Sequence, residues 1–121
     1  MANEKILVVD DSPTDLKLMT APLRTRGYQI VTAADGEQAL ELAVKEQPRL
    51  IVLDIVLPKK NGFQVCRQLK TSPDTQDIKI IMLTSKTQDS DRFWGLQQGA
   101  DEYLTKPFDE DQFLTRIAEL L

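Results

Sequence analysis

Residues 50–54 read Leu-Ile-Val-Leu-Asp, a run of four apolar side chains that ends on a carboxylate. A short run of this kind predicts a strand that is buried on both faces, as in the centre of a parallel sheet. Residues 5–9 and 79–83 have the same character, and residues 29–33 and 102–104 complete a set of five predicted strands. Longer segments with helical spacing separate them, which is typical of strand-helix units repeated around a parallel sheet.

The segments between the strands predict helices with recognisable ends. The first three helices begin at residue types that cap helices: Ser12, Asp35 and Asn61. A fourth is expected over residues 89–98 before Gly99, and a fifth over residues 108–121. The sequence therefore predicts one α/β domain over residues 1–121, with a doubly wound, flavodoxin-like sheet of order 2-1-3-4-5 flanked by five helices.

Composition excludes several classes of function. The net charge is −4, with 15 basic against 19 acidic residues, and this argues against a nucleic-acid partner. A single cysteine, Cys66, and the lack of histidine disfavour a disulfide framework or a zinc site. No apolar run approaches the roughly 18 residues that a membrane span requires. We therefore expect a cytoplasmic protein whose partners are other proteins.

Polar residues follow four of the five predicted strands. The first is followed by Asp10 and Asp11, the third by Asp54, the fourth by Thr84 and the fifth by Lys106. Ligands of open parallel sheets bind at the carboxyl ends of the strands, so these side chains should converge. Carboxylates about 4 Å apart repel by about 4 kcal/mol per pair at an effective dielectric of 20. A cation is needed there, and Mg²⁺ suits carboxylate and phosphate oxygens.

The segments that carry this chemistry form a recognisable set. VVDDSP at residues 8–13, VLDIVLPKKNG at 52–62, MLTSK at 82–86 and YLTKPF at 103–108 resemble the signature segments of bacterial two-component response regulator receiver domains. Together they span nearly the whole chain. The resemblance implies a switch that takes a phosphoryl group from a sensor histidine kinase or a phosphotransfer protein. It also implies a protein that catalyses only its own phosphorylation and dephosphorylation, and is therefore not an enzyme acting on other substrates.

The resemblance also implies roles for individual residues. It implies that Asp54 is the phosphoacceptor and that Mg²⁺ is held by Asp10, Asp11, Asp54 and the Val56 carbonyl. It implies that Thr84 and Lys106 bind the phosphoryl oxygens. It further implies that Tyr103 is an aromatic switch residue and that the peptide bond before Pro107 is cis. The residue types agree with these roles, because a carboxylate nucleophile forms an acyl phosphate while Mg²⁺ and an ammonium neutralise the transferring group.

Each of these residues also has an ordinary structural interpretation. An Asp-Asp pair after a strand is more often a helix cap, and a lone Lys106 is more often a surface cation. The combined placement at one edge of the sheet favours the receiver interpretation. An aspartyl-phosphate hydrolase is the first alternative, although that class usually carries a second Asp two residues after the nucleophile, where Val56 stands here. A phosphorylation-independent binding module, or a receiver excised from a longer regulator, is the second.

The output is expected to be another protein. DDSPTD at residues 10–15, LKTSPDTQDIK at 69–79 and the segment from residue 91 to 108 are similar to stand-alone receivers of pilus-driven twitching motility and phototaxis. The target would then be a pilus motor or a chemotaxis-like kinase complex. On the fourth helix, the spacing predicts that Phe93 and Leu96 are buried and that Trp94 faces solvent. Trp94 is therefore the expected anchor for the partner.

Overall fold

The computed structural model describes residues 3–121 and contains one sheet of five parallel strands. The strands are β1 (Lys5–Val9), β2 (Gln29–Ala33), β3 (Leu50–Leu53), β4 (Lys79–Thr84) and β5 (Glu102–Thr105). Their order is β2-β1-β3-β4-β5, and every neighbouring pair is parallel. The predicted flavodoxin-like sheet is confirmed.

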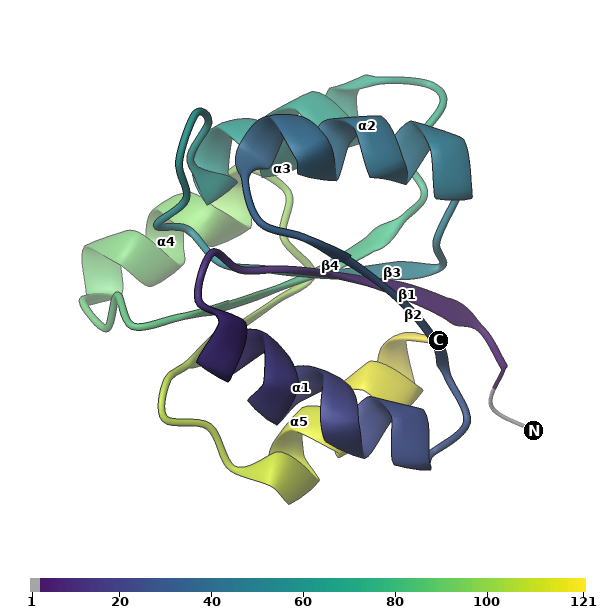
Figure 1. Ribbon diagram of the computed structural model, residues 1–121. Coiled ribbons are helices and arrows are strands. Elements are labelled where there is room, and N and C mark those ends of the chain that lie inside the picture. Colours follow the sequence, from purple (N-terminus) through teal and green to yellow (C-terminus); the bar gives the residue numbers. More distant parts are fainter. Residues whose placement is uncertain (1–2) are drawn as a thin grey trace.

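Five helices connect the strands. They are α1 (Pro13–Thr25), α2 (Gly36–Glu46), α3 (Gly62–Thr71), α4 (Asp89–Gln97) and α5 (Glu110–Leu120). Figure 1 shows α1 and α5 on one face of the sheet, α2 and α3 on the other, and α4 at one side of the α2–α3 layer. No helix among residues 3–121 is long and apolar enough to cross a bilayer.

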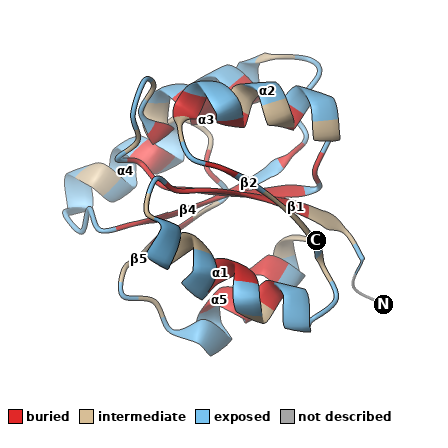
Figure 2. Ribbon diagram, in the orientation of Figure 1, coloured by how far each residue is buried: buried red, intermediate tan, exposed pale blue. Residues whose placement is uncertain are grey.

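Two hydrophobic cores lie on the two faces of the sheet, because successive strand residues point in opposite directions. Leu7 belongs to the core beneath α2 and α3, whereas Ile6 belongs to the core beneath α1 and α5. Both side chains are fully buried, and Figure 2 shows the central strands buried along most of their length. The apolar runs of the sequence therefore correspond to strands that are covered on both faces, as predicted.

Local sequence explains most of the element ends. Ser12 caps α1 by accepting from the Asp15 amide, and Asn61 forms a full capping box with Gln64. Asp35 caps α2 as expected. The two strands β4 and β5 each extend one residue further than predicted, because their parallel pairing continues to Thr84 opposite Thr105.

The orientation of α4 differs from the sequence prediction. Phe93 and Leu96 are 60% and 45% exposed, so the expectation that they form the buried side of this helix is wrong. The helix instead packs through Gly95, its only buried residue. A Cβ at Gly95 would lie 2.7 Å from Sδ of Met82 and 2.9 Å from Tyr103, so a small residue is needed for this close approach.

Candidate functional site

The carboxyl ends of the central strands bring the predicted site residues to one edge of the sheet. Asp10 follows β1 and Asp54 follows β3, and the pairing of Val9 with Leu53 places these two aspartates side by side. Thr84 ends β4, the neighbour of β3. The convergence expected from the strand order is therefore present in the structure.

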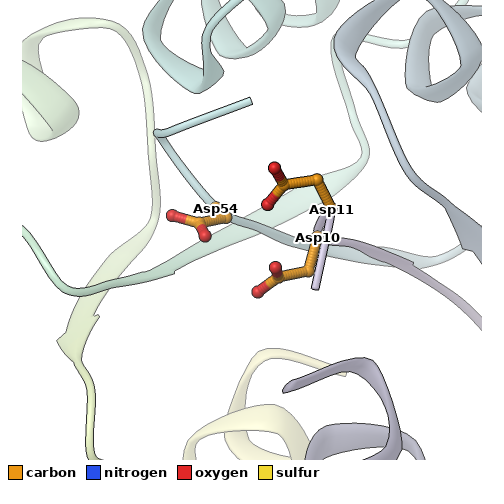
Figure 3. Close-up of side chains that lie close together, drawn as sticks. All are labelled: Asp10, Asp11 and Asp54. Carbon is orange, nitrogen blue, oxygen red and sulfur yellow. The ribbon is translucent and has the colours of Figure 1, made fainter. Parts of the chain in front are cut away.

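Three carboxylates form an acidic cluster at this edge. Asp10, Asp11 and Asp54 each offer an oxygen atom, and these atoms lie within 4.8 Å of one another. Figure 3 shows the three side chains projecting from the ends of β1 and β3. Asp10 and Asp54 are buried, and Asp11 is exposed. Hard oxygen ligands at this spacing, with one side open to water, fit a Mg²⁺ ion that keeps some of its hydration shell.

The environment of Asp10 disfavours its charge. Burial raises the pKa of the Asp10 carboxyl above its usual value, and the negative charge of Asp54 acts in the same direction. Hydrogen bonds from the Lys106 ammonium and the Ser12 amide oppose this shift in pKa. A buried carboxylate with this raised pKa gains from a bound cation, which again favours a metal at the cluster.

Lys106 lies at the centre of the site. Its Nζ donates to Asp10 at 2.6 Å, to Asp15 at 2.9 Å and to Asp54 at 3.1 Å. Burial alone would lower the pKa of this ammonium, but the hydrogen bonds to Asp10 and Asp15, together with the charge of Asp54, raise it above its usual value. Lys106 is therefore protonated at neutral pH, and its ammonium binds anionic oxygens.

Asp15 is the site residue that the sequence prediction missed. Its position indicates only an acidic residue in the first turn of α1, where carboxylates are favoured by the helix dipole. A signal was present, because α1 begins directly after the carboxyl end of β1 and its first turn must lie beside the site. Asp15 is the third carboxylate that Lys106 contacts, beside Asp10 and Asp54.

The backbone around Asp54 holds its carboxylate in place. Oδ1 accepts from the Ile55 amide at 2.6 Å and from the Val56 amide at 3.3 Å, while Oδ2 faces Lys106. Gly62 lies directly against the Asp54 carbonyl, where any Cβ would overlap it. The first residue of α3 is therefore restricted to glycine by the position of Asp54.

Thr84 and Tyr103 are connected through the backbone of Lys86. The Lys86 amide donates to Thr84 Oγ1 at 3.4 Å, and the Tyr103 hydroxyl donates to the Lys86 carbonyl at 2.7 Å. Thr84 is fully buried, and Tyr103 is only 1% exposed. Burial raises the pKa of Tyr103 to about 12, with the nearby Asp91 charge adding to the shift. Its phenol is therefore a stable donor at neutral pH.

Three further predictions concern Val56, Trp94 and the peptide bond before Pro107. Val56 is exposed beside Asp54, and Trp94 is exposed on α4, as the helical spacing predicted. The peptide bond between Lys106 and Pro107 is cis. The structure thus brings Asp10, Asp11, Asp54 and Lys106 into one site and places Trp94 on a separate surface.

Comparison with known sequences identifies similar proteins. Residues 6–118 match a family described as the response regulator receiver domain. Protein PilH of Pseudomonas aeruginosa is 44% identical over 117 residues, which cover 97% of this chain and 97% of that protein. The DNA-binding dual master transcriptional regulator RpaA of a Synechocystis species is also 44% identical over 117 residues. The match covers 48% of RpaA, so this chain spans about half the length of that regulator.

Solved structures with the same fold include chemotaxis and kinase-linked proteins. Chemotaxis protein CheY4 of Vibrio cholerae has a TM-score of 0.91 and 32% identity, covering 99% of this chain and 100% of that one. The receiver domain of the sensor histidine kinase PA1611 of Pseudomonas aeruginosa has a TM-score of 0.87 and 34% identity, covering 98% and 96%. That structure has a magnesium ion coordinated in its active site cleft.

Proposed function

The chain belongs to the response regulator receiver domain family, and we propose that it works as a phosphorylation switch in which Asp54 accepts the phosphoryl group. One observation carries the assignment to Asp54. Its buried carboxylate lies within 4.8 Å of those of Asp10 and Asp11 and accepts a hydrogen bond from Lys106. Phosphorylation of the isolated protein by a small acyl phosphate tests this, with Asp54→Asn as the control.

The proposed reaction is a transfer between two protein side chains. A carboxylate oxygen of Asp54 attacks the phosphorus of a phosphohistidine on a sensor kinase or phosphotransfer protein. The phosphorus-nitrogen bond breaks, an acyl phosphate forms, and the imidazole leaves with a proton from solvent. The amides of Ile55 and Val56 keep the Asp54 carboxylate oriented for this attack. Lys106 binds a phosphoryl oxygen and neutralises charge on the transferring group.

Receiver domains bind Mg²⁺ at an acidic site, and the acidic cluster described here fits that ion. We assign the ligands to the carboxylates of Asp10, Asp11 and Asp54 and to the Val56 carbonyl. Bound there, Mg²⁺ supplies positive charge that screens the carboxylates from the incoming phosphoryl group. Thr84 contributes a hydroxyl that donates to a phosphoryl oxygen.

The proposed switch uses the connection from Thr84 through Lys86 to Tyr103. In this structure Tyr103 is already turned inward, with its hydroxyl on the Lys86 carbonyl. A phosphoryl group on Asp54 accepts a hydrogen bond from the Thr84 hydroxyl. This bond stabilises the state with Tyr103 buried relative to a state in which the Tyr103 side chain faces solvent. The shift of this equilibrium changes the conformation of the surface formed by α4, β5 and α5, which carries Trp94. Binding of the target protein to that face is the output.

The proposed pathway is pilus-driven motility or phototaxis, with a pilus motor or a chemotaxis-like kinase complex as the target. Its support is the similarity of residues 10–15, 69–79 and 91–108 to stand-alone receivers of such systems. The identity to PilH over 97% of both chains agrees with a receiver of this size.

The hydrolase alternative has less support. An acid or base two residues after the nucleophile is replaced by Val56, whose apolar side chain is 52% exposed and offers no proton. We therefore propose that the protein turns over only its own acyl phosphate and does not hydrolyse external phosphoesters.

A further inference from the structure

The first turn of α1 is attached to the site by a closed ring of hydrogen bonds. The Ser12 amide donates to Asp10 Oδ1 at 2.9 Å, and the Asp15 amide donates to Ser12 Oγ at 3.2 Å. Lys106 Nζ closes the ring by donating to Oδ2 of Asp15 at 2.9 Å and to Oδ2 of Asp10 at 2.6 Å. Lys106 therefore connects Asp54, the proposed nucleophile, to Asp15 on helix α1.

All hydrogen-bond donors of Lys106 are used in this arrangement. An ammonium has three N–H groups, and three carboxylates accept from them. The bond to Asp54 Oδ2 passes to the phosphoryl group when that oxygen is esterified, and a second phosphoryl oxygen that binds Lys106 must replace Asp10 or Asp15. The partner with the lowest cost of release is the one that water can best solvate once it is free.

Asp15 is that partner. Its side chain is 36% exposed, whereas those of Asp10 and Asp54 are 0% and 7% exposed. Asp15 also lines an open cavity of about 540 Å³ between α1 and the segment that follows β5. Water in this cavity can replace the ammonium at Asp15, while Asp10 has no such access.

We propose that Asp15 is a positioning residue that holds Lys106 while Asp54 is unmodified and releases it to the phosphoryl group. This inference rests on the proposed phosphorylation of Asp54. The contact between Asp15 and Lys106 stabilises only the unmodified state, so it lowers the affinity of the site for a phosphoryl group. Phosphorylation opens the ring at Asp15, while the Ser12 amide stays bound to Asp10.

The test measures binding of beryllofluoride, a phosphoryl analogue, by calorimetry in saturating Mg²⁺. Asp15→Asn removes the carboxylate that competes for Lys106. We expect this variant to bind beryllofluoride about threefold tighter, because a partly exposed ion pair such as Asp15–Lys106 contributes little free energy. Asp15→Glu restores a carboxylate that can reach Lys106 and should return the affinity toward that of the wild type. Thermal melting of each variant confirms that it is folded.

Glu110→Gln is the matched control for charge. Glu110 lines the same cavity but forms no ion pair with Lys106 in the part of the chain that the structure describes. Its variant should bind beryllofluoride like the wild type. Equal affinity of Asp15→Asn and wild type, or an equal gain in Glu110→Gln, would overturn the role of Asp15 alone. A wild type that binds no beryllofluoride would overturn the proposed function, and this inference with it.

Discussion

The hydroxyl of Tyr103 donates a 2.7 Å hydrogen bond to the main-chain carbonyl of Lys86, two residues beyond Thr84 at the site edge. This contact connects the proposed phosphorylation site to β5, in the face proposed for output. The Tyr103 side chain is buried, and this burial raises its pKa to about 12. The connection can therefore be tested through its pH dependence as well as through binding.

Tyr103 makes stability depend on pH in an alkaline range. An unfolded tyrosine ionises near pH 10, whereas the buried Tyr103 keeps its proton up to about pH 12. Between these values the folded state binds more protons, so stability falls as the pH rises. Tyr103→Phe lacks this contribution, and its disadvantage relative to wild type should shrink from pH 9 to pH 11.5 in urea denaturation. A constant difference would show that Tyr103 does not titrate as described.

Asp11→Asn should stabilise the protein in metal-free buffer. The substitution removes one of three clustered carboxylates, and Asp11 makes no ion pair with Lys106 in residues 3–121. The same change should abolish the rise in melting temperature that Mg²⁺ gives the wild type. Calorimetry with EDTA and with Mg²⁺ measures both effects. A lower melting temperature than wild type in EDTA would contradict the crowding of these carboxylates.

Val56→Asn should shorten the lifetime of the phosphoryl group. Val56 is exposed beside Asp54 and cannot orient an attacking water, whereas an amide side chain can. Fold stability should change by no more than about 0.5 kcal/mol, as for most surface substitutions. The measurement is the decay of the phosphorylated protein after the donor is removed. Decay as slow as that of the wild type would rule out this role for position 56.

Trp94→Ala should separate phosphorylation from output. Trp94 is 56% exposed, so its removal should change stability by about 0.5 kcal/mol or less and leave phosphorylation intact. Target binding should fall strongly, because exposed tryptophans at interfaces often dominate the affinity. Leu18→Ala is the control, since Leu18 is equally exposed at 57% but lies on α1. The readout is capture of the target by immobilised, phosphorylated variants.

Two outcomes would contradict this role of Trp94. A large loss of stability in Trp94→Ala would show that the side chain supports the fold. Equal loss of target capture in Leu18→Ala would place the partner on another face.

The fold could be predicted from the sequence because its strands are short apolar runs with polar residues at their carboxyl ends. The position of Asp54 follows directly from the strand at residues 50–53. The start of α1 after β1 indicates that Asp15 lies near the site, but the sequence does not show that its partner is Lys106, 91 positions away. The packing of α4 through Gly95 was missed because helical spacing favours large apolar residues as the buried side.

The central claim is that Asp54 accepts a phosphoryl group in a Mg²⁺-dependent reaction. Intact mass measured after incubation with acetyl phosphate and Mg²⁺ tests it most directly, with EDTA as the metal-free comparison. Asp74→Asn is the matched control, because Asp74 is exposed in the α3–β4 connection, away from the site edge. We predict one labile phosphoryl group on wild type and on Asp74→Asn, and none on Asp54→Asn or in EDTA. An unmodified wild type, or an Asp54→Asn variant modified to the same extent, would contradict the account.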